Sequence, residues 1–359
     1  MNHHRTLISY VLFTALFSFL LLFTTGCSKE KESGESSKAD NTLYLFNWTY
    51  YTPESVIEAF EKEYGVKVVL DYFASNEDMF AKLKGGGSGY DVVFPSQDYA
   101  EIMIREKMAA PLDHEKLDNL RYISPLARQK ATYDPDMVYA VPYYMGASGI
   151  AVMKNSVEDY PRDWSIFSDS RFRNRMSMLD DMREVMGAAL AHLGYSVNSL
   201  DPDELEKATR LVNGQWKPNI VKFDAEGFAK AFSSGEFSVV HGYGEAVFEE
   251  IEEERWDDVD FFLPEEGGPM YLDSMMIPVT ARHVELAHLF INFIHRPEMY
   301  AQFLDRFRFP STVHTEAEQY RTTEPIYSSD ALAAYELKMD LGENLPLYDN
   351  LWQTIRYDD

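Results

Sequence analysis

Apolar and polar positions alternate along the first part of the chain with two different periods. Short, nearly continuous apolar runs have the length of buried strands at residues 43–46, 66–70 and 91–94. Between and after them the apolar spacing is helical, over residues 53–65, 76–83 and 97–106. Pro53 opens the first predicted helix, and Asn76 is expected to cap the second. This strand–helix alternation predicts a parallel α/β sheet covered by helices on both faces.

The same alternation returns in the second half of the chain, after residue 146. Strand-like runs occupy residues 177–179, 237–241, 257–263 and 271–278. Helical spacing is found over residues 182–193, 228–232, 284–294 and 348–357. No internal repeat is visible, so the sequence predicts a second, distinct α/β unit.

Aromatic residues follow the first predicted strand, where a parallel sheet usually binds its ligand. Trp48 and Tyr51 lie in a polar stretch with Thr49, and Ser96 and Asp98 follow the third predicted strand. Aromatic rings in such loops often only pack in the hydrophobic core. In a cleft, their electron-rich faces would suit an organic cation.

Carboxylates stand at two further places that suit a cation. Asp181 and Glu184 follow a short predicted strand and open a helix, where acidic residues commonly complement only the helix dipole. Tyr243 follows another strand, and Tyr271 and Asp273 are two residues apart, so they share one face of a strand. An aromatic ring beside a carboxylate matches the needs of an ammonium group.

Composition narrows the class of partner. The chain carries 33 basic and 59 acidic side chains, a net charge of −26, which excludes binding to a nucleic-acid backbone. A single cysteine excludes an internal disulfide and a cysteine-based metal site. Small cations are the natural partners of such a surface, although acidity alone also confers solubility. The acidic run from Glu249 to Glu254 is expected to be one solvated helix face.

Motifs for catalysis or cofactor binding are not found. The Gly-rich stretch 85–89 lacks the Lys-Ser/Thr ending of a phosphate loop, and residues 146–149 have the wrong spacing for a nucleophile elbow. No H-E-x-x-H pattern or His–Cys pairing is present. We therefore expect a protein that is not an enzyme and that needs no cofactor and no metal.

The N-terminus has the features of an export signal. A basic start is followed by an uncharged apolar run from Leu7 to Phe23 and a small-residue exit. The only cysteine, Cys27, follows that exit, as in the lipobox of bacterial lipoproteins. We expect residues 1–26 to be a lipoprotein signal peptide, Cys27 to be lipidated and residues 27–41 to be a flexible tether. An uncleaved membrane anchor is the alternative.

An ordered set of motifs resembles one known family. The motifs are LFNWTYY at 45–51, SNEDMFAKL at 75–83, YDVVFPS at 90–96, VPYYMG at 141–146, LDDMRE at 179–184, PEEGG at 264–268 and DSMMIP at 273–278. Together they resemble the substrate-binding lipoproteins of bacterial spermidine/putrescine ABC transporters, members of the extracellular solute-binding proteins. The resemblance spans about residues 43–310.

This resemblance implies a two-lobed α/β fold of the periplasmic-binding-protein type, with hinge strands crossing between the lobes. One lobe would hold residues 43–146 plus 272–317, and the other 147–271 plus 318–359. A polyamine would bind in the cleft between them and be delivered to the permease subunits of an ABC transporter. The protein would be a periplasmic monomer, anchored to a membrane by its lipid.

The family's ligand contacts can be carried over by position. They fall on Trp48, Thr49, Tyr51, Ser96, Asp98, Asp181, Glu184, Tyr243, Tyr271 and Asp273. Tyr243 and Tyr271 stand where the family usually has tryptophan, and Asp98 stands where spermidine-binding relatives have tyrosine. These exchanges leave spermidine and putrescine undecided. The family's C-terminal ligand-contacting glutamine has no clear counterpart.

Three other interpretations remain open from the residues. The same fold could bind another cationic or neutral solute. A glycosidase could use Asp181 or Glu184 together with Asp273. A surface lipoprotein could sense polyamine without transporting it.

Overall fold

A computed structural model describes residues 41–49, 51–73 and 75–357 of the 359-residue chain. The predicted signal peptide, the lipidation site Cys27 and all but the last residue of the predicted tether lie outside these residues. Within the described ranges, no helix combines the length and apolar character needed to cross a bilayer.

The first sheet contains six strands, in the order β11-β10-β3-β1-β2 with β4 paired to β10. Its strands are β1 (Thr42–Trp48), β2 (Lys67–Phe73), β3 (Val92–Val93), β4 (Ala140–Ala147), β10 (Pro269–Met276) and β11 (Glu336–Leu337). The three strands predicted from the first apolar runs are parallel, whereas β10 runs antiparallel to β3 and β4. The carboxyl ends of β1 and β3 therefore meet at one edge, as expected.

The second sheet has five strands in the order β7-β6-β8-β5-β9. They are β5 (Gly149–Met153), β6 (Met176–Met178), β7 (Ile220–Phe223), β8 (Val239–Gly242) and β9 (Val259–Phe262). Strands β6, β7 and β8 are parallel, and β5 runs antiparallel to both of its neighbours, β8 and β9. The α/β fold class predicted from the sequence is confirmed in both halves.

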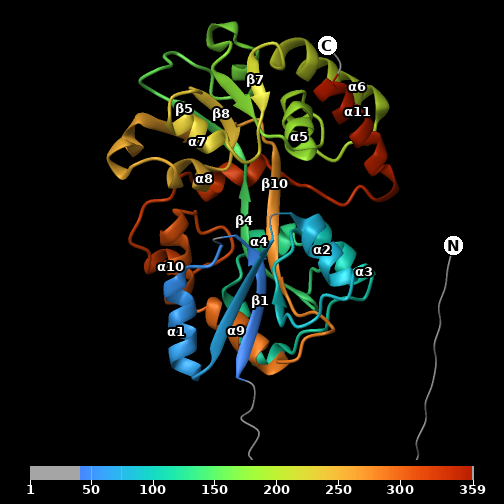
Figure 1. Cartoon of the computed structure of the whole chain (residues 1–359), viewed down its shortest axis with the longest axis vertical. Coiled ribbons are helices and arrows are strands. Elements are labelled where there is room, and N and C mark those ends of the chain that lie inside the picture. Colours follow the sequence, from blue (N-terminus) through green and yellow to red (C-terminus); the bar gives the residue numbers. More distant parts are fainter. Residues whose placement is uncertain (1–40, 50, 74, 358–359) are drawn as a thin grey trace, which may run out of the picture. The chain divides into compact units, whose positions relative to one another are not determined.

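The chain crosses between the two sheets twice, and the two crossings lie side by side. Strand β4 of the first sheet continues through the single residue Ser148 into β5 of the second, and the chain returns from β9 into β10. Figure 1 shows β4 and β10 running together between the two halves, and they pair from Ala147↔Met270 to Ala140↔Met276. The paired strands β4 and β10 run between the two sheets. A side chain on β10 can therefore contribute to a site formed by both halves of the structure.

Helices cover both sheets (Figure 1). They are α1 (Glu54–Tyr64), α2 (Asn76–Lys84), α3 (Gln97–Arg105), α4 (Pro125–Lys130), α5 (Met182–His192), α6 (Pro202–Leu211), α7 (Phe228–Ser233), α8 (Gly244–Glu249), α9 (Val284–Ile294), α10 (Pro297–Phe307) and α11 (Leu345–Tyr357). The bounds of α9 are those predicted from its apolar spacing. The C-terminal helix α11 buries Tyr348, Trp352 and Ile355 in the core of the second sheet.

Two local predictions were wrong. The side chain that caps α2 is Ser75, whose Oγ accepts the N–H of Asp78; Asn76 instead accepts the N–H of Ser96. The acidic run 249–254 is not one helix, because α8 ends at Glu249 and a short 3-10 helix begins at Glu253. Its acidic side chains are exposed, as expected.

Candidate functional site

Asp273 on β10 is the centre of the first group of predicted residues. Its side chain is only 4% exposed, and its Oδ1 accepts a 2.6 Å hydrogen bond from the Ser96 hydroxyl at the start of α3. The buried Tyr51 hydroxyl has no hydrogen-bond partner of standard geometry, yet it lies close enough to lower the pKa of Asp273. Burial outweighs these two contacts and the attraction of the Lys338 charge, and it raises the pKa of Asp273 to about 6. No Lys, Arg or His within the described ranges forms an ion pair with it.

A second carboxylate, Glu245, lies close to Asp273. It stands in the first turn of α8, and burial together with the nearby Asp273 charge raises its pKa to about 7. Its charge acts on Tyr144, Tyr243, Tyr271 and Tyr327, so these rings surround it. No described Lys, Arg or His pairs with Glu245 either. The sequence interpretation did not select this residue, although it follows Tyr243 by two positions.

Tyrosine rings form the walls around these two carboxylates. Tyr243 and Tyr271 meet edge to face at 5.9 Å between ring centroids, and Tyr271 also contacts Tyr144 at 6.1 Å. Tyr51 packs edge to face on Tyr143 and Phe303. Three of the predicted aromatic residues therefore lie around Asp273 and Glu245, with one from the first sheet's loop, one from β10 and one from the start of α8.

Trp48 and Thr49 are placed differently. Trp48 ends β1, its indole N–H donates to the carbonyl of Phe94, and its ring packs on Phe73 at 4.5 Å. Thr49 is exposed in the following turn. These contacts give Trp48 a packing role, and contact of either residue with a ligand stays a prediction.

Asp181 and Glu184 mark a second group, at the start of α5. Asp181 caps the helix, since its Oδ1 accepts the N–H groups of Arg183 and Glu184 at 2.8 and 3.0 Å. Glu184 is 0% exposed and accepts hydrogen bonds from the Ser148 hydroxyl and, at 3.4 Å, from the Tyr243 hydroxyl. Glu184 therefore contacts Ser148, which links the two sheets, and Tyr243, one of the tyrosines near Asp273.

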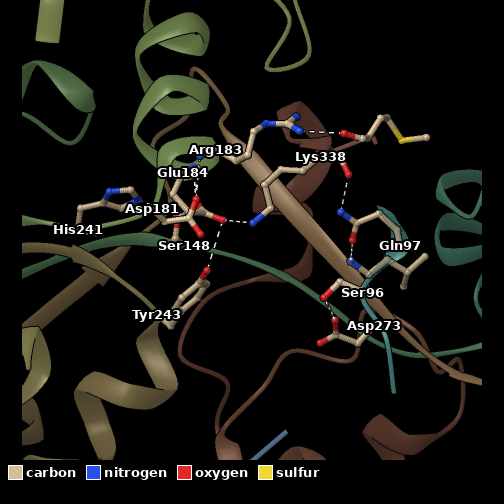
Figure 2. Close-up of polar contacts among 12 residues, drawn as sticks. Ser96, Gln97, Ser148, Asp181, Arg183, Glu184, His241, Tyr243, Asp273 and Lys338 are labelled. Atoms are coloured by element: carbon tan, nitrogen blue, oxygen red, sulfur yellow. Dashed lines mark hydrogen bonds and ion pairs between the residues drawn. The ribbon is translucent and has the colours of Figure 1, made fainter. Parts of the chain in front are cut away.

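Lys338 joins this second group from the far end of the chain. Its ammonium forms an ion pair with Glu184, with its side chain 14% exposed (Figure 2). Burial lowers the pKa of Lys338, but the charges of Glu184, Asp181 and Asp98 outweigh burial and leave the pKa raised. Burial raises the pKa of Asp98 in α3, and the charges of Lys338 and Arg183 oppose this. Lys338 therefore gathers three of the predicted carboxylates around one cation.

Lys338 was missed by sequence reasoning. Glu184 precedes it by 154 positions, and the segment between α10 and α11 holds only short 3-10 helices and the two-residue strand β11. The signal available was modest: a lone lysine between the apolar residues Leu337 and Met339, in an acidic chain.

A hydrogen-bonded chain leads from Glu184 to a buried histidine. The Ser148 hydroxyl lies 2.8 Å from Nε2 of His241, and burial lowers the pKa of His241 to about 3. Because the single hydroxyl proton is donated to Glu184, the neutral imidazole must donate its Nε2 proton to Ser148. Ser148, the one residue between β4 and β5, is therefore fixed from both sides (Figure 2).

Gly146 offers a test of how tightly the Tyr271 wall is packed. A Cβ at this position would lie 2.7 Å from the Tyr271 hydroxyl and 2.8 Å from Cε1 of Tyr144, both on rigid rings. We expect Gly146→Ala to lower the free energy of unfolding by about 1–3 kcal/mol, the cost of overpacking. Gly214→Ala is the matched control, because nothing lies within 4 Å of its Cβ position. Denaturant unfolding of both variants measures the difference; equal stabilities would contradict this packing.

Other parts of the described surface do not compete as the site. Two surface hollows lie elsewhere: one is lined by residues including Ser124, His314 and Glu318, the other by residues including Phe248, Trp256 and Arg308. Neither contains any of the ten predicted ligand residues. Among the described residues, no group of three or more His, Cys, Asp or Glu side chains has an arrangement suited to a metal ion.

The fold and this acidic, tyrosine-lined site define a class of protein. The profile of the bacterial extracellular solute-binding proteins matches residues 55–334. The match covers most of the chain, so the protein belongs to this family, and the predicted family and two-lobed fold are confirmed.

Individual relatives and one solved structure align with most of the chain. The spermidine/putrescine-binding periplasmic protein 1 of Haemophilus influenzae is 32% identical over 352 residues, 94% of this chain and 96% of the relative. The spermidine/putrescine-binding periplasmic protein of Escherichia coli is 31% identical over 326 residues, 88% and 92% of the two chains. The crystal structure of the Tp0655 (TpPotD) lipoprotein of Treponema pallidum matches with 52% identity and a TM-score of 0.86, covering 88% of this chain and 99% of that one.

Proposed function

We propose that this protein binds a polyamine cation between its two halves and delivers it to the permease of an ABC transporter. The observation that carries the proposal is a pair of carboxylates, the buried Asp273 and the partly buried Glu245, that lie among tyrosine rings without an ion-paired Lys, Arg or His in the described part of the chain. Charges buried in this way are costly unless a partner neutralises them. An alkyl ammonium would supply that partner.

The chemistry of the walls suits such a ligand. Tyr51, Tyr243 and Tyr271 present ring faces and edges for the methylene groups, and each cation–π contact contributes about 0.5–2 kcal/mol. Charge-assisted hydrogen bonds from an ammonium to Asp273 and Glu245 add to this. Micromolar affinity requires about 8 kcal/mol, so a few such contacts suffice. The names of the relatives in Haemophilus influenzae and Escherichia coli support the same ligand class.

Catalysis is not favoured by the arrangement of the carboxylates. Asp181 caps α5, and Glu184 is engaged by Lys338, Ser148 and Tyr243. A glycosidase needs one carboxyl group poised to protonate a leaving group and another left to attack. We propose that the protein binds its solute without chemical change, consistent with its family.

The proposed location of the protein rests on its N-terminal sequence and on its relatives. We propose export, lipidation at Cys27 and anchoring of a monomer to a membrane through that lipid. The lipoprotein from Treponema pallidum, which is 52% identical, supports this part of the proposal.

The proposed function is tested by calorimetric titration of the full chain, purified in a nonionic detergent, with putrescine and spermidine. At about 0.15 M salt, where loose attraction between exposed charges is largely screened, we expect saturable one-to-one binding with a dissociation constant of about 1 μM or less. Glu254→Gln removes an exposed acid of the 249–254 run and should bind equally well. A folded protein that releases no heat with either polyamine would contradict the proposal.

A further inference from the structure

The parallel pairing of β10 with β11 stops abruptly. The N–H of Glu336 donates to the carbonyl of Gly268, and two residues later the N–H of Lys338 donates to the carbonyl of Met270, both at 3.1 Å. In a regular parallel ladder, the next hydrogen bond would run from the N–H of Leu272 to the carbonyl of Lys338. Both of these backbone groups instead bind a side chain.

That side chain is Gln97, the first residue of α3, which is only 1% exposed. Its Oε1 accepts the N–H of Leu272 at 2.9 Å, and its Nε2 donates to the carbonyl of Lys338 (Figure 2). The orientation of the amide is fixed, because a backbone N–H can only donate and a carbonyl can only accept. Gln97 therefore takes the place of a peptide group within the ladder.

The two residues before Gln97 bind the next two residues of β10. The Ser96 hydroxyl donates to Oδ1 of Asp273 at 2.6 Å, and the carbonyl of Pro95 accepts the N–H of Ser274 at 2.9 Å. On the opposite side of β10, the pairing with β4 shifts register between Asp273 and Ser274. Three consecutive residues of β10 are therefore held by residues 95–97 at a point where the sheet itself is irregular.

We propose that Gln97 is a positioning residue for polyamine binding, whose amide bridges β10 and the segment after β11 so that Tyr271 and Asp273, on either side of Leu272, present their side chains to the ligand. This inference rests on the proposed function. It adds to the site a residue that does not itself have to touch the ligand.

Loss of the amide has two possible structural results, and both disturb the site. The N–H of Leu272 and the carbonyl of Lys338 either stay buried without a partner, which is costly, or bond directly to each other and draw the two segments together. In each case the backbone between Tyr271 and Asp273 shifts. Binding groups have to be held within about 0.5 Å of their productive positions, so the affinity for a polyamine falls.

A competing explanation is that Gln97 only fills space. Methionine fills a similar volume without an amide, and glutamic acid has the shape of glutamine. Protonated glutamic acid offers one donor and one acceptor, as the amide does here, whereas the ionised form can only accept. If the bridge positions β10, glutamic acid can replace Gln97 only when it is protonated.

The test is calorimetric titration of the full chain with putrescine and with spermidine, in the wild type, Gln97→Met and Gln97→Glu, at pH 8 and pH 5.5. Each variant is compared with the wild type at the same pH, because protonation of Asp273 and Glu245 affects all three proteins. With the ligand that the wild type binds more tightly, Gln97→Met should bind at least about fivefold more weakly at both pH values, since its two backbone partners are left unpaired.

Gln97→Glu should also bind at least about fivefold more weakly at pH 8, and this factor should fall at least about threefold at pH 5.5, where the carboxyl takes up a proton. An added negative charge would by itself strengthen binding of a cation at pH 8, so the expected weakening has the opposite sign. Gln129→Glu, the same exchange at an exposed position, should match the wild type at both pH values.

A loss of less than fivefold in Gln97→Met overturns the inference, as does a Gln97→Glu factor that is the same at both pH values. If Gln97→Met does not fold by circular dichroism, the pH comparison of Gln97→Glu decides alone. These outcomes leave polyamine binding by the wild type intact. A folded wild type that binds neither polyamine would instead remove the proposed function, and this inference with it.

Discussion

Asp273→Asn should abolish high-affinity polyamine binding and, at the same time, make the protein without ligand more stable. Binding should weaken at least about 30-fold, because losing one member of a buried charge pair typically costs 2–5 kcal/mol. Stability should rise because Asp273 is buried without a cation, and asparagine keeps the oxygen that accepts the Ser96 hydroxyl proton. The Asp273 carboxylate is therefore expected to strengthen ligand binding and to lower the stability of the protein without ligand.

The sign of the stability effect follows from the pKa of Asp273. Burial raises it from 3.8 to about 6, so the folded state holds this proton more tightly than the unfolded state. The contribution of the neutral carboxyl to stability is complete below pH 4 and is lost as the pH rises through about 6. Two pH units correspond to about 3 kcal/mol. We expect Asp273→Asn to recover about 2–3 kcal/mol at pH 7.5 and almost nothing at pH 4.

Chemical unfolding at both pH values and calorimetric titration with putrescine at pH 7.5 measure the two effects. Asp257→Asn, the same exchange at an exposed position, should change neither. A loss of stability in Asp273→Asn at pH 7.5 would mean that this carboxylate already has a compensating partner. Undiminished binding would remove Asp273 from the ligand site.

The parts of the fold that could be predicted from the sequence are those that local rules determine. Strands such as β1 and β2 and the helix α9 follow local rules, because burial of one face dictates apolar spacing. Ser75 was overlooked as the cap of α2 because Asn76 is an equally good capping residue one position later. The strand β4 was not predicted as a strand, although its sequence was recognised as a family motif; all eight of its residues are buried, so no alternation marks it.

Site residues were predictable where strand geometry placed them. Tyr243 was found because it follows a strand, and Tyr271 and Asp273 because they share one face of a strand; these three residues lie together with Tyr51. Glu245 was not selected, and its place in the first turn of a helix does not by itself mark a ligand contact.

Lys338 could not be found by local rules at all. Its contact with the site depends on a single long-range ion pair with Glu184, which lies 154 positions earlier in the chain. A residue that departs from the family pattern can be interpreted once its neighbours in the structure are known. Asp98, predicted as a ligand contact at a position where spermidine-binding relatives have tyrosine, lies where it can interact with Lys338.

Glu184→Gln should be the most destabilising single change at the site. It removes the charge that neutralises Lys338, whose side chain is only 14% exposed, and it replaces an acceptor of the Ser148 and Tyr243 hydroxyl protons by a group with fewer acceptor positions. Breaking a buried ion pair from one side typically costs 3–5 kcal/mol. Asp98 and Asp181 still act on Lys338, so we expect a loss of about 3 kcal/mol in the free energy of unfolding.

A double-mutant cycle identifies the cause of that loss. In a background where Lys338 is replaced by methionine, Glu184→Gln should cost at least about 2 kcal/mol less, since no buried ammonium is then left unpaired. The control is Glu249→Gln, which breaks an ion pair with Arg306 between two well-exposed side chains and should cost no more than about 1 kcal/mol. If Glu184→Gln cost the same with and without Lys338, the loss would come from the Ser148 and Tyr243 hydrogen bonds, and the ion pair would not be what fixes Lys338 in the site.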